Sequence, residues 1–196
     1  MNNLKAKSGE RRRVIATALC GIAFVVGGVA FRAQRANAYS TYGCNWGSGK
    51  TSLYFTNNFN SSPYTAGARW NSAAANLRFI AGGSDFVVEG QNAGNTGWAG
   101  LTHNAGTYTS WNPCSTGTVV TKNTYYAGYP NGDEDVLTHE FGHVAGLADI
   151  NAVIPSCPGG GFTYYAVMHY SMEHVTGACP AINPTADDVS GVNSIY

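Results

Sequence analysis

The hydrophobic positions of this chain follow more than one pattern. Residues 14–31 form an almost unbroken apolar run, whereas the remainder mixes short alternating stretches with stretches of helical period. Alternating apolar and polar residues, or a high content of β-branched and aromatic ones, predict strands. Five strands are predicted in this way, at 51–56, 77–80, 86–89, 97–103 and 118–127.

Helical spacing of apolar residues, or a high alanine content, predicts three helices. The first covers 64–76, and the last covers 186–196 with Thr185 as its N-cap. The second begins at the acidic residues 133–135, where the helix dipole favours carboxylates, and Gly146 is expected to end it. Its buried stripe is expected to comprise Leu137, Phe141, Val144 and Ala148. Strands around one helix, followed by loops between two later helices, predict an α+β domain.

The apolar run near the N-terminus divides the chain. It follows a cluster of basic residues and precedes residues 36–38, Ala-Asn-Ala, a small-x-small sequence of the type that signal peptidase cleaves. Residues 1–38 are therefore predicted to be a secretory signal peptide, and residues 39–196 one mature domain. An uncleaved signal anchor is the alternative, because a run of this length is just enough to span a bilayer. The protein is expected to be secreted and extracellular, without stable membrane association after cleavage.

Removing the leader leaves an acidic domain. The chain has 11 basic and 11 acidic side chains, and the leader contains seven of the basic ones and one of the acidic ones. Four basic and ten acidic residues remain, which give a formal charge of −6. A negative surface with few basic groups argues against nucleic acid or an anionic membrane as a partner.

Four cysteines remain once Cys20 is lost with the leader. An even count in an exported chain predicts two disulfides, and four cysteines allow three pairings. We favour Cys157–Cys179 as a local loop, which leaves Cys44–Cys114 as the long-range bond. Metal binding by these cysteines is the alternative, but the sequence has no close Cys-x-x-Cys pair.

The sequence His139-Glu140-Phe141-Gly142-His143 places two histidines four residues apart on a predicted helix. This spacing puts both rings on one face of the helix, where both can bind one ion, and zinc is typical of the His-Glu-x-x-His motif. Glu140 is expected to act as the general base on a water at that ion. The alternative is a pair of ordinary surface histidines.

A catalytic zinc site needs a third protein ligand and one open position. Gly146, three residues after His143, can adopt a left-handed conformation that ends the helix and turns the chain back. Asp149, three residues further on, is then the predicted third ligand; its alternative role is that of a turn residue at the helix end. Rival ligands lie downstream, at His169, Tyr170 and His174.

The extended motif resembles that of the metzincin metallopeptidases, His-Glu-x-x-His-x-x-Gly-x-x-His followed by a methionine turn. Asp149 stands where most metzincins have the third histidine, as in their snapalysin-like bacterial branch. Residues 166–170, Ala-Val-Met-His-Tyr, resemble the methionine turn. The resemblance implies that Met168 lies under the zinc, and that Tyr170 is an extra ligand or stabilises the oxyanion. Residues 100–103 and 184–192 are similar to the cleft strand and C-terminal helix of the matrixins.

The resemblance also implies a fold and an activity. The fold is zincin-like, with a twisted mixed sheet, an active-site helix, the methionine turn and a C-terminal helix. The activity is that of a secreted zinc endopeptidase whose protein or peptide substrate pairs with an edge strand near residues 97–101. Related enzymes often bind calcium as well, although no loop in this sequence is diagnostic for Ca²⁺. A monomer is expected.

Two other functions compete with a peptidase. One is a non-catalytic, zinc-stabilised module that binds peptides, and the other is a structural or inhibitory protein held by disulfides. The binding module explains both histidines but gives Glu140 no role. Zinc content separates the disulfide-held protein from the other two, and substitution of Glu140 separates enzyme from binder.

Overall fold

The computed structural model describes residues 39–106, 112–126, 132–150, 153–154, 164–169 and 182–196. All of them belong to residues 35–196, one of the chain's two compact units. The predicted signal peptide, the predicted Cys157–Cys179 bond, Tyr170 and His174 lie outside the described residues. Within the described residues, no helix has the length and apolar character needed to cross a membrane.

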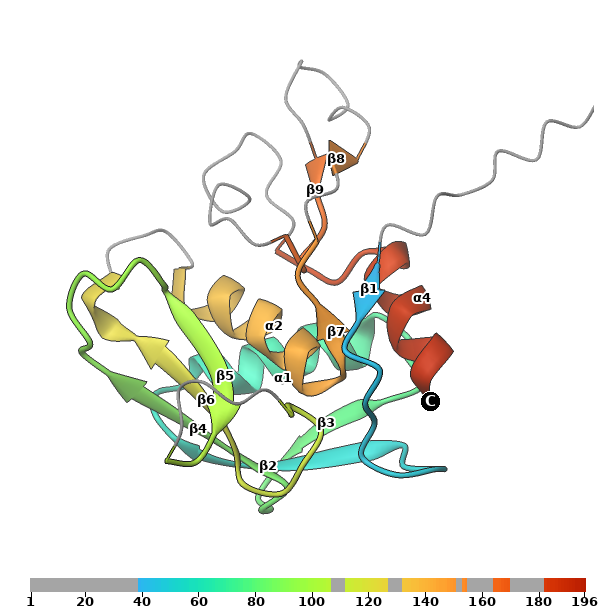
Figure 1. The fold of residues 1–196 in the computed structure, drawn as a ribbon, viewed down its shortest axis with the longest axis horizontal. Coiled ribbons are helices and arrows are strands. Elements are labelled where there is room, and N and C mark those ends of the chain that lie inside the picture. Colours follow the sequence, from blue (N-terminus) through green and yellow to red (C-terminus); the bar gives the residue numbers. More distant parts are fainter. Residues whose placement is uncertain (1–38, 107–111, 127–131, 151–152, 155–163, 170–181) are drawn as a thin grey trace, which may run out of the picture. The chain divides into compact units, whose positions relative to one another are not determined.

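A five-stranded mixed sheet forms the centre of this unit (Figure 1). Its order is β3 (Arg78–Ala81), β2 (Ser52–Asn58), β4 (Phe86–Gln91), β6 (Thr118–Asn123) and β5 (Gly100–Asn104). The first four strands are parallel, whereas β5 runs antiparallel to β6 and forms one edge. The part of the chain that the structure describes also contains two short strand pairs: β1 (Ser40–Thr41) with β7 (Leu147–Ala148), and β8 (Val153–Ile154) with β9 (Tyr164–Tyr165).

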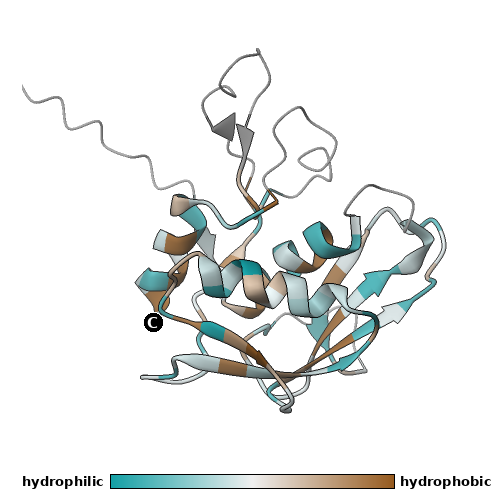
Figure 2. Cartoon of the chain, turned by 180° about the vertical axis from the view of Figure 1, so that it is seen from behind, coloured by the Kyte–Doolittle hydropathy of each residue, from teal (hydrophilic) through white to brown (hydrophobic). Residues whose placement is uncertain are grey.

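Within the described residues, three helices accompany the sheet: α1 (Ser62–Ser72), α2 (Gly132–Val144) and α4 (Ala186–Ile195), with a short 3₁₀ turn at Thr124–Tyr126. Both α1 and α2 pack on one face of the sheet through a cluster of aromatic rings. The ring of Phe141 in α2 lies 4.9 Å from that of Phe79 and 5.3 Å from that of Phe86. Figure 2 shows hydrophobic residues both on the strands and on the helices beside them. The predicted α+β class is therefore confirmed, with a mixed sheet.

Several predicted boundaries were wrong for identifiable reasons. The strand β6 ends at Asn123 rather than at 127, because the Asn123 side chain bonds to the backbone of Ala93, Gly94 and Trp98 and the chain then turns. The helix α1 ends at Ser72 rather than at 76, since Ala74 adopts a left-handed φ of 60°. Ala148 was assigned to the stripe of the second helix, but it lies in β7.

The two ends of the described domain are fixed by features that the sequence predicted. Cys44 and Cys114 form a disulfide, which confirms the long-range bond. Thr185 is the N-cap of α4 in a capping box, where the backbone N–H of Thr185 donates to the Asp188 carboxylate at 2.7 Å. The same carboxylate accepts a hydrogen bond from the backbone N–H of Val167 at 3.3 Å. The start of α4 is thereby tied to the segment that precedes Met168.

Candidate metal centre

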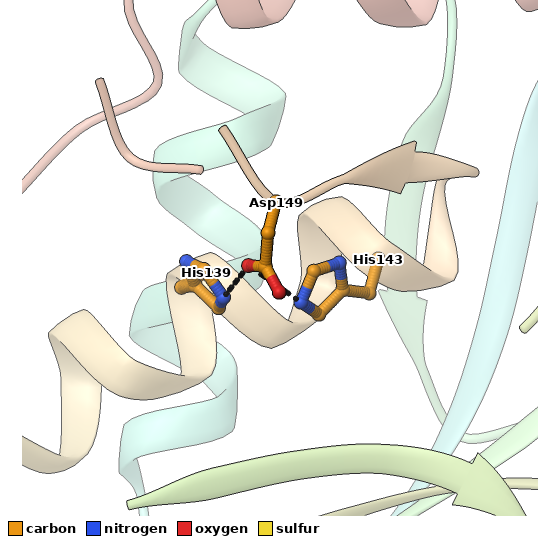
Figure 3. Close-up of side chains that lie close together, drawn as sticks. All are labelled: His139, His143 and Asp149. Carbon is orange, nitrogen blue, oxygen red and sulfur yellow. Dashed lines mark ion pairs between the residues drawn. The ribbon is translucent and has the colours of Figure 1, made fainter. Parts of the chain in front are cut away.

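The structure brings His139, His143 and Asp149 together, as Figure 3 shows. The histidines lie one turn apart on α2, and Asp149 reaches them from the segment after β7. Asp149 Oδ1 is 3.2 Å from His139 Nε2 and 3.4 Å from His143 Nε2. One ligand atom from each of the three residues lies within 4.8 Å of the others. The sequence predicted this set as the metal ligands.

The turn between α2 and Asp149 has the left-handed glycine that the sequence predicted at position 146. Gly146 has a φ of 92°, a conformation that L side chains rarely adopt, and its N–H donates to His143 O at 2.8 Å. The chain then pairs with β1 along β7. Beyond Asp149, the N–H of Ile150 donates to Met168 O at 2.9 Å. Backbone contacts on both sides therefore fix the approach of Asp149 to the helix.

Both histidine rings are oriented by backbone carbonyls. His139 Nδ1 lies 2.8 Å from Val167 O, and His143 Nδ1 lies 2.9 Å from Leu147 O. A carbonyl can only accept, so each Nδ1 carries a hydrogen and each Nε2 is the atom directed at Asp149. This second set of contacts is the usual means by which proteins fix the tautomer of metal-binding histidines.

The negative charges in the cluster favour a positive charge on His139, and they therefore shift the pKa values of the cluster. Burial lowers the pKa of His139, but the hydrogen bond to Asp149 and the charges of Glu140 and Asp149 outweigh it and raise this pKa to about 9. Burial raises the pKa of Asp149, but hydrogen bonds and charges from the two histidines hold it well below its usual range. At neutral pH the metal-free cluster is therefore a protonated histidine paired with a carboxylate.

The geometry and chemistry of the three residues fit zinc. Tetrahedral zinc with bonds of about 2.0 to 2.1 Å has ligand atoms about 3.3 to 3.4 Å apart. The two separations from Asp149 Oδ1, 3.2 and 3.4 Å, match such an edge. Two imidazoles and one carboxylate are also a donor set typical of catalytic zinc, which keeps a fourth position open. The donor types and these two separations therefore fit a zinc ion.

Glu140 is buried beside this cluster and is held by the edge strand β5. Thr102 Oγ1 donates a hydrogen bond to Glu140 Oε2 at 2.7 Å. Gly100 also faces the glutamate, because a Cβ at that position would lie 2.6 Å from Glu140 Oε1 and 2.5 Å from Val136 Cγ1. The sequence placed this strand near the site, but it did not reveal that Gly100 and Thr102 contact Glu140.

Met168 packs against the same helix. Its side chain is fully buried, and a Cβ at Gly142 would clash with its sulfur. Gly142 lies between the two histidines in sequence, so the methionine supports the helix turn that carries them. Residues 166–169 form a tight turn, in which the N–H of His169 donates to Ala166 O at 3.0 Å. His169, a rival ligand in the sequence, is buried in this turn and pairs through its backbone with Ile150.

Tyr42 is a neighbour of the cluster that the sequence did not single out. Its ring centroid lies 5.7 Å from that of His143. Burial raises the pKa of Tyr42, as do the nearby charges of Asp149 and Glu140, whereas a hydrogen bond from the backbone of Asp149 lowers it. Tyr42 is one of 12 tyrosines, at no motif spacing, so sequence gave no signal.

Comparisons with known proteins do not identify a family for this chain, so its function is inferred from the site. No protein-family model matches the chain. No curated protein sequence matches it either. Among solved structures, it resembles a chain from the "GM1 bound form of the ECX AB5 holotoxin" with a TM-score of 0.48 and 13% identity, covering 74% of this chain and 80% of the other. A likeness this distant carries no functional conclusion.

Proposed function

We propose that this chain is a zinc-dependent endopeptidase of the metzincin type, close to the snapalysin-like and matrixin-like bacterial enzymes. The arrangement of the sheet supports the proposal, because an antiparallel edge strand borders the helix that carries the His-Glu-x-x-His motif. The buried Met168 beneath that helix supports it as well. Asp149 takes the place of a third histidine.

The observation that carries the proposal is the placement of Glu140. Its carboxylate lies close enough to His139 for its charge to raise the pKa of that histidine, and Thr102 holds it by a hydrogen bond. A module that only binds zinc has no need of a carboxylate that is fixed beside the ligands yet does not belong to them. A peptidase needs one there, because a general base must lie within hydrogen-bond reach of the attacking water.

The residues then divide the work of peptide hydrolysis. Zinc, when bound, supplies a Lewis acid that polarises the scissile carbonyl and makes water a better nucleophile at neutral pH. Glu140 accepts the proton of the attacking water and passes it to the leaving amine. His139, His143 and Asp149 hold the metal. The negative charge of Asp149 strengthens the attraction of the site for a cation and reduces the Lewis acidity of the bound zinc. Tyr170 is proposed to stabilise the oxyanion or to be a further ligand.

The substrate is proposed to be an extended protein or peptide segment that adds to the edge strand β5. One side of Gly100–Asn104 pairs with β6, and the other side is the edge of the sheet. Backbone pairing along such an edge gives affinity without fixing side-chain preference. The contacts of Gly100 and Thr102 with Glu140 support this proposal, because they bring the edge strand close to the proposed general base.

Export is part of the proposal. The Cys44–Cys114 disulfide supports it, because such bonds persist mainly in oxidising compartments. We propose that cleavage after Ala38 releases an extracellular domain that begins at Tyr39, and that Cys157 pairs with Cys179. N-terminal sequencing of the exported protein tests the cleavage site, and any other first residue contradicts it.

The function is tested by hydrolysis of casein before and after removal of metal by a chelator. We expect the chelator to abolish hydrolysis and added zinc to restore it. An Asp149→Ala variant should lose both zinc and activity, whereas Asp149→His should retain zinc better than the alanine variant because imidazole is a competent ligand. Full zinc occupancy in Asp149→Ala, or hydrolysis unaffected by the chelator, would contradict the proposal.

A further inference from the structure

The edge strand β5 directs its side chains alternately to the two faces of the sheet. Gly100 and Thr102 lie on the face that carries α2, because both approach Glu140. Lys122, the partner of Gly100 in β6, also faces α2, since its ammonium group forms an ion pair of 3.2 Å with the first turn of that helix. Leu101 therefore projects to the opposite face of the sheet, away from α2.

A pocket of about 440 Å³ lies beside Leu101. Its other lining residues are Gln91 at the end of β4, and Ala93 and Trp98 in the loop that joins β4 to β5. The volume falls within the range of about 300 to 1,000 Å³ that is usual for ligand sites. Leucine, alanine and tryptophan supply an apolar lining, and none of the four residues is charged. The pocket therefore suits an uncharged, apolar group.

The loop that forms this pocket is held in place by two polar side chains. Asn123, at the end of β6, accepts a hydrogen bond from the N–H of Ala93 at 3.1 Å and donates one to Trp98 O at 3.1 Å. The hydroxyl oxygen of Tyr126 accepts a hydrogen bond from the N–H of Gly97 at 3.2 Å. These bonds fix the backbone at both loop residues that line the pocket, so its shape does not depend on a ligand.

An extended peptide on the edge of β5 would bring a side chain to this pocket. A strand added at this edge continues the pleat, and its residue opposite Leu101 projects to the same face, with the two Cβ atoms about 4.5 to 5.5 Å apart. The peptide residues before and after it pair with positions 100 and 102, which face Glu140. The side chain that reaches the pocket therefore belongs to a residue close to the bond that is cut.

We propose that this pocket is a substrate subsite that selects a large apolar side chain, with Trp98 and Leu101 as its specificity-determining residues. The inference rests on the proposed function, because it takes β5 as the strand to which the peptide substrate adds. The pocket supplies a side-chain preference that backbone pairing alone does not give. A side chain that fills an apolar pocket is typically preferred about tenfold or more over one that leaves it empty. A charged side chain is disfavoured, because it would lose its hydration without gaining a partner.

The test maps the cuts that the protein makes in a synthetic library of peptides of mixed sequence. The wild type is compared with Trp98→Ala, which enlarges the pocket, and with Ala93→Trp, which fills it. Ile80→Ala is the matched control, because Ile80 is 37% exposed on β3 at the opposite edge of the sheet. We expect the wild type to prefer a large apolar residue over alanine about tenfold or more, at one position within about two residues of the cut. Both pocket variants should lose this preference, and Ile80→Ala should keep it.

Tryptophan fluorescence measures the same contact without hydrolysis. Two peptides, with phenylalanine or alanine at the preferred position, are added to zinc-loaded Glu140→Gln, which should bind them without cutting them. The phenylalanine peptide should change the emission more than the alanine peptide does. This difference should disappear when Trp98→Phe is combined with Glu140→Gln. Thermal unfolding of each variant checks that the fold is kept.

The outcomes separate this inference from the proposed function. Cleavage preferences that are the same in the wild type, Trp98→Ala and Ala93→Trp would overturn the subsite and leave the peptidase proposal standing. A wild type that cuts peptides with no preference for apolar residues near the cut would overturn it as well. A wild type that cuts no peptide would remove the proposed function and this inference together.

Discussion

At the proposed zinc site, zinc and a proton should compete for His139, and this competition should give a measurable dependence of zinc affinity on pH. The perturbation is a change of pH between 6 and 10. In the metal-free protein the pKa of His139 is about 9, whereas zinc requires the neutral imidazole. At pH 7 this proton weakens zinc binding about 100-fold, or by about 2.7 kcal/mol, because each pH unit below the pKa costs about 1.36 kcal/mol.

The sign of the effect is fixed by the direction of the shift. Because the pKa of His139 is raised in the folded state, apparent zinc affinity should rise about tenfold per pH unit up to pH 9 and then level off. The same shift stabilises the metal-free fold fully below pH 6.5, and this contribution is lost as the pH rises through about 9. The lowered pKa of Asp149 also stabilises the metal-free fold at pH values above 3.8, the ordinary pKa of this side chain. This stabilisation is lost as the pH falls further.

Isothermal titration calorimetry measures this competition directly. Zinc binding at pH 7 in buffers of different ionisation enthalpy should release about one proton from His139 per ion bound. The matched variant is Asp149→Asn, which removes a hydrogen bond and a charge that raise the pKa of His139, so His139 in the metal-free variant should titrate at a lower pH by NMR than in the metal-free wild type. Zinc affinity that is constant between pH 7 and 8.5, with no proton released, would show that zinc does not displace a proton from His139.

Three further predictions concern the supports of the site. Gly100→Ala should lower kcat by about 100-fold with zinc content unchanged, because its Cβ would displace the carboxylate of Glu140; unchanged peptide hydrolysis would contradict the contact. Thr102→Val removes the hydrogen bond to Glu140 and should lower kcat about tenfold or more, and a normal kcat in steady-state assays would count against its role. Replacing Cys44 and Cys114 by serine opens a loop closed over 70 residues and should cost about 4 kcal/mol of unfolding free energy in urea titrations, where an unchanged midpoint would be inconsistent with this bond.

The parts of the site that the sequence predicted are those set by local spacing. The four-residue interval between His139 and His143 fixes one helix face, and Gly146 fixes the turn that follows. Asp149 follows from that turn by counting residues. Thr185 was likewise predicted as an N-cap, because capping depends on the next few residues alone. Such features need no knowledge of how distant segments pack.

The parts that could not be predicted depend on long-range packing. Tyr42 reaches the cluster because the disulfide and the β1–β7 pair place its segment at the end of α2. Thr102 meets Glu140 because β5 is the edge strand that lies against α2, although 38 residues separate them in sequence. The early end of β6 has the same origin, since the Asn123 side chain bonds to a loop some 30 residues away. No local pattern encodes these contacts.

Glu140 is proposed to act as the base at a zinc site that it does not help to build. The most direct measurement places the wild type beside Glu140→Gln, a variant of nearly the same shape, and determines zinc content and peptide hydrolysis on the same samples. We expect one zinc per molecule in both proteins and hydrolysis by the wild type alone. Equal hydrolysis by both would contradict the role of Glu140, and absence of zinc from the wild type would contradict the site itself.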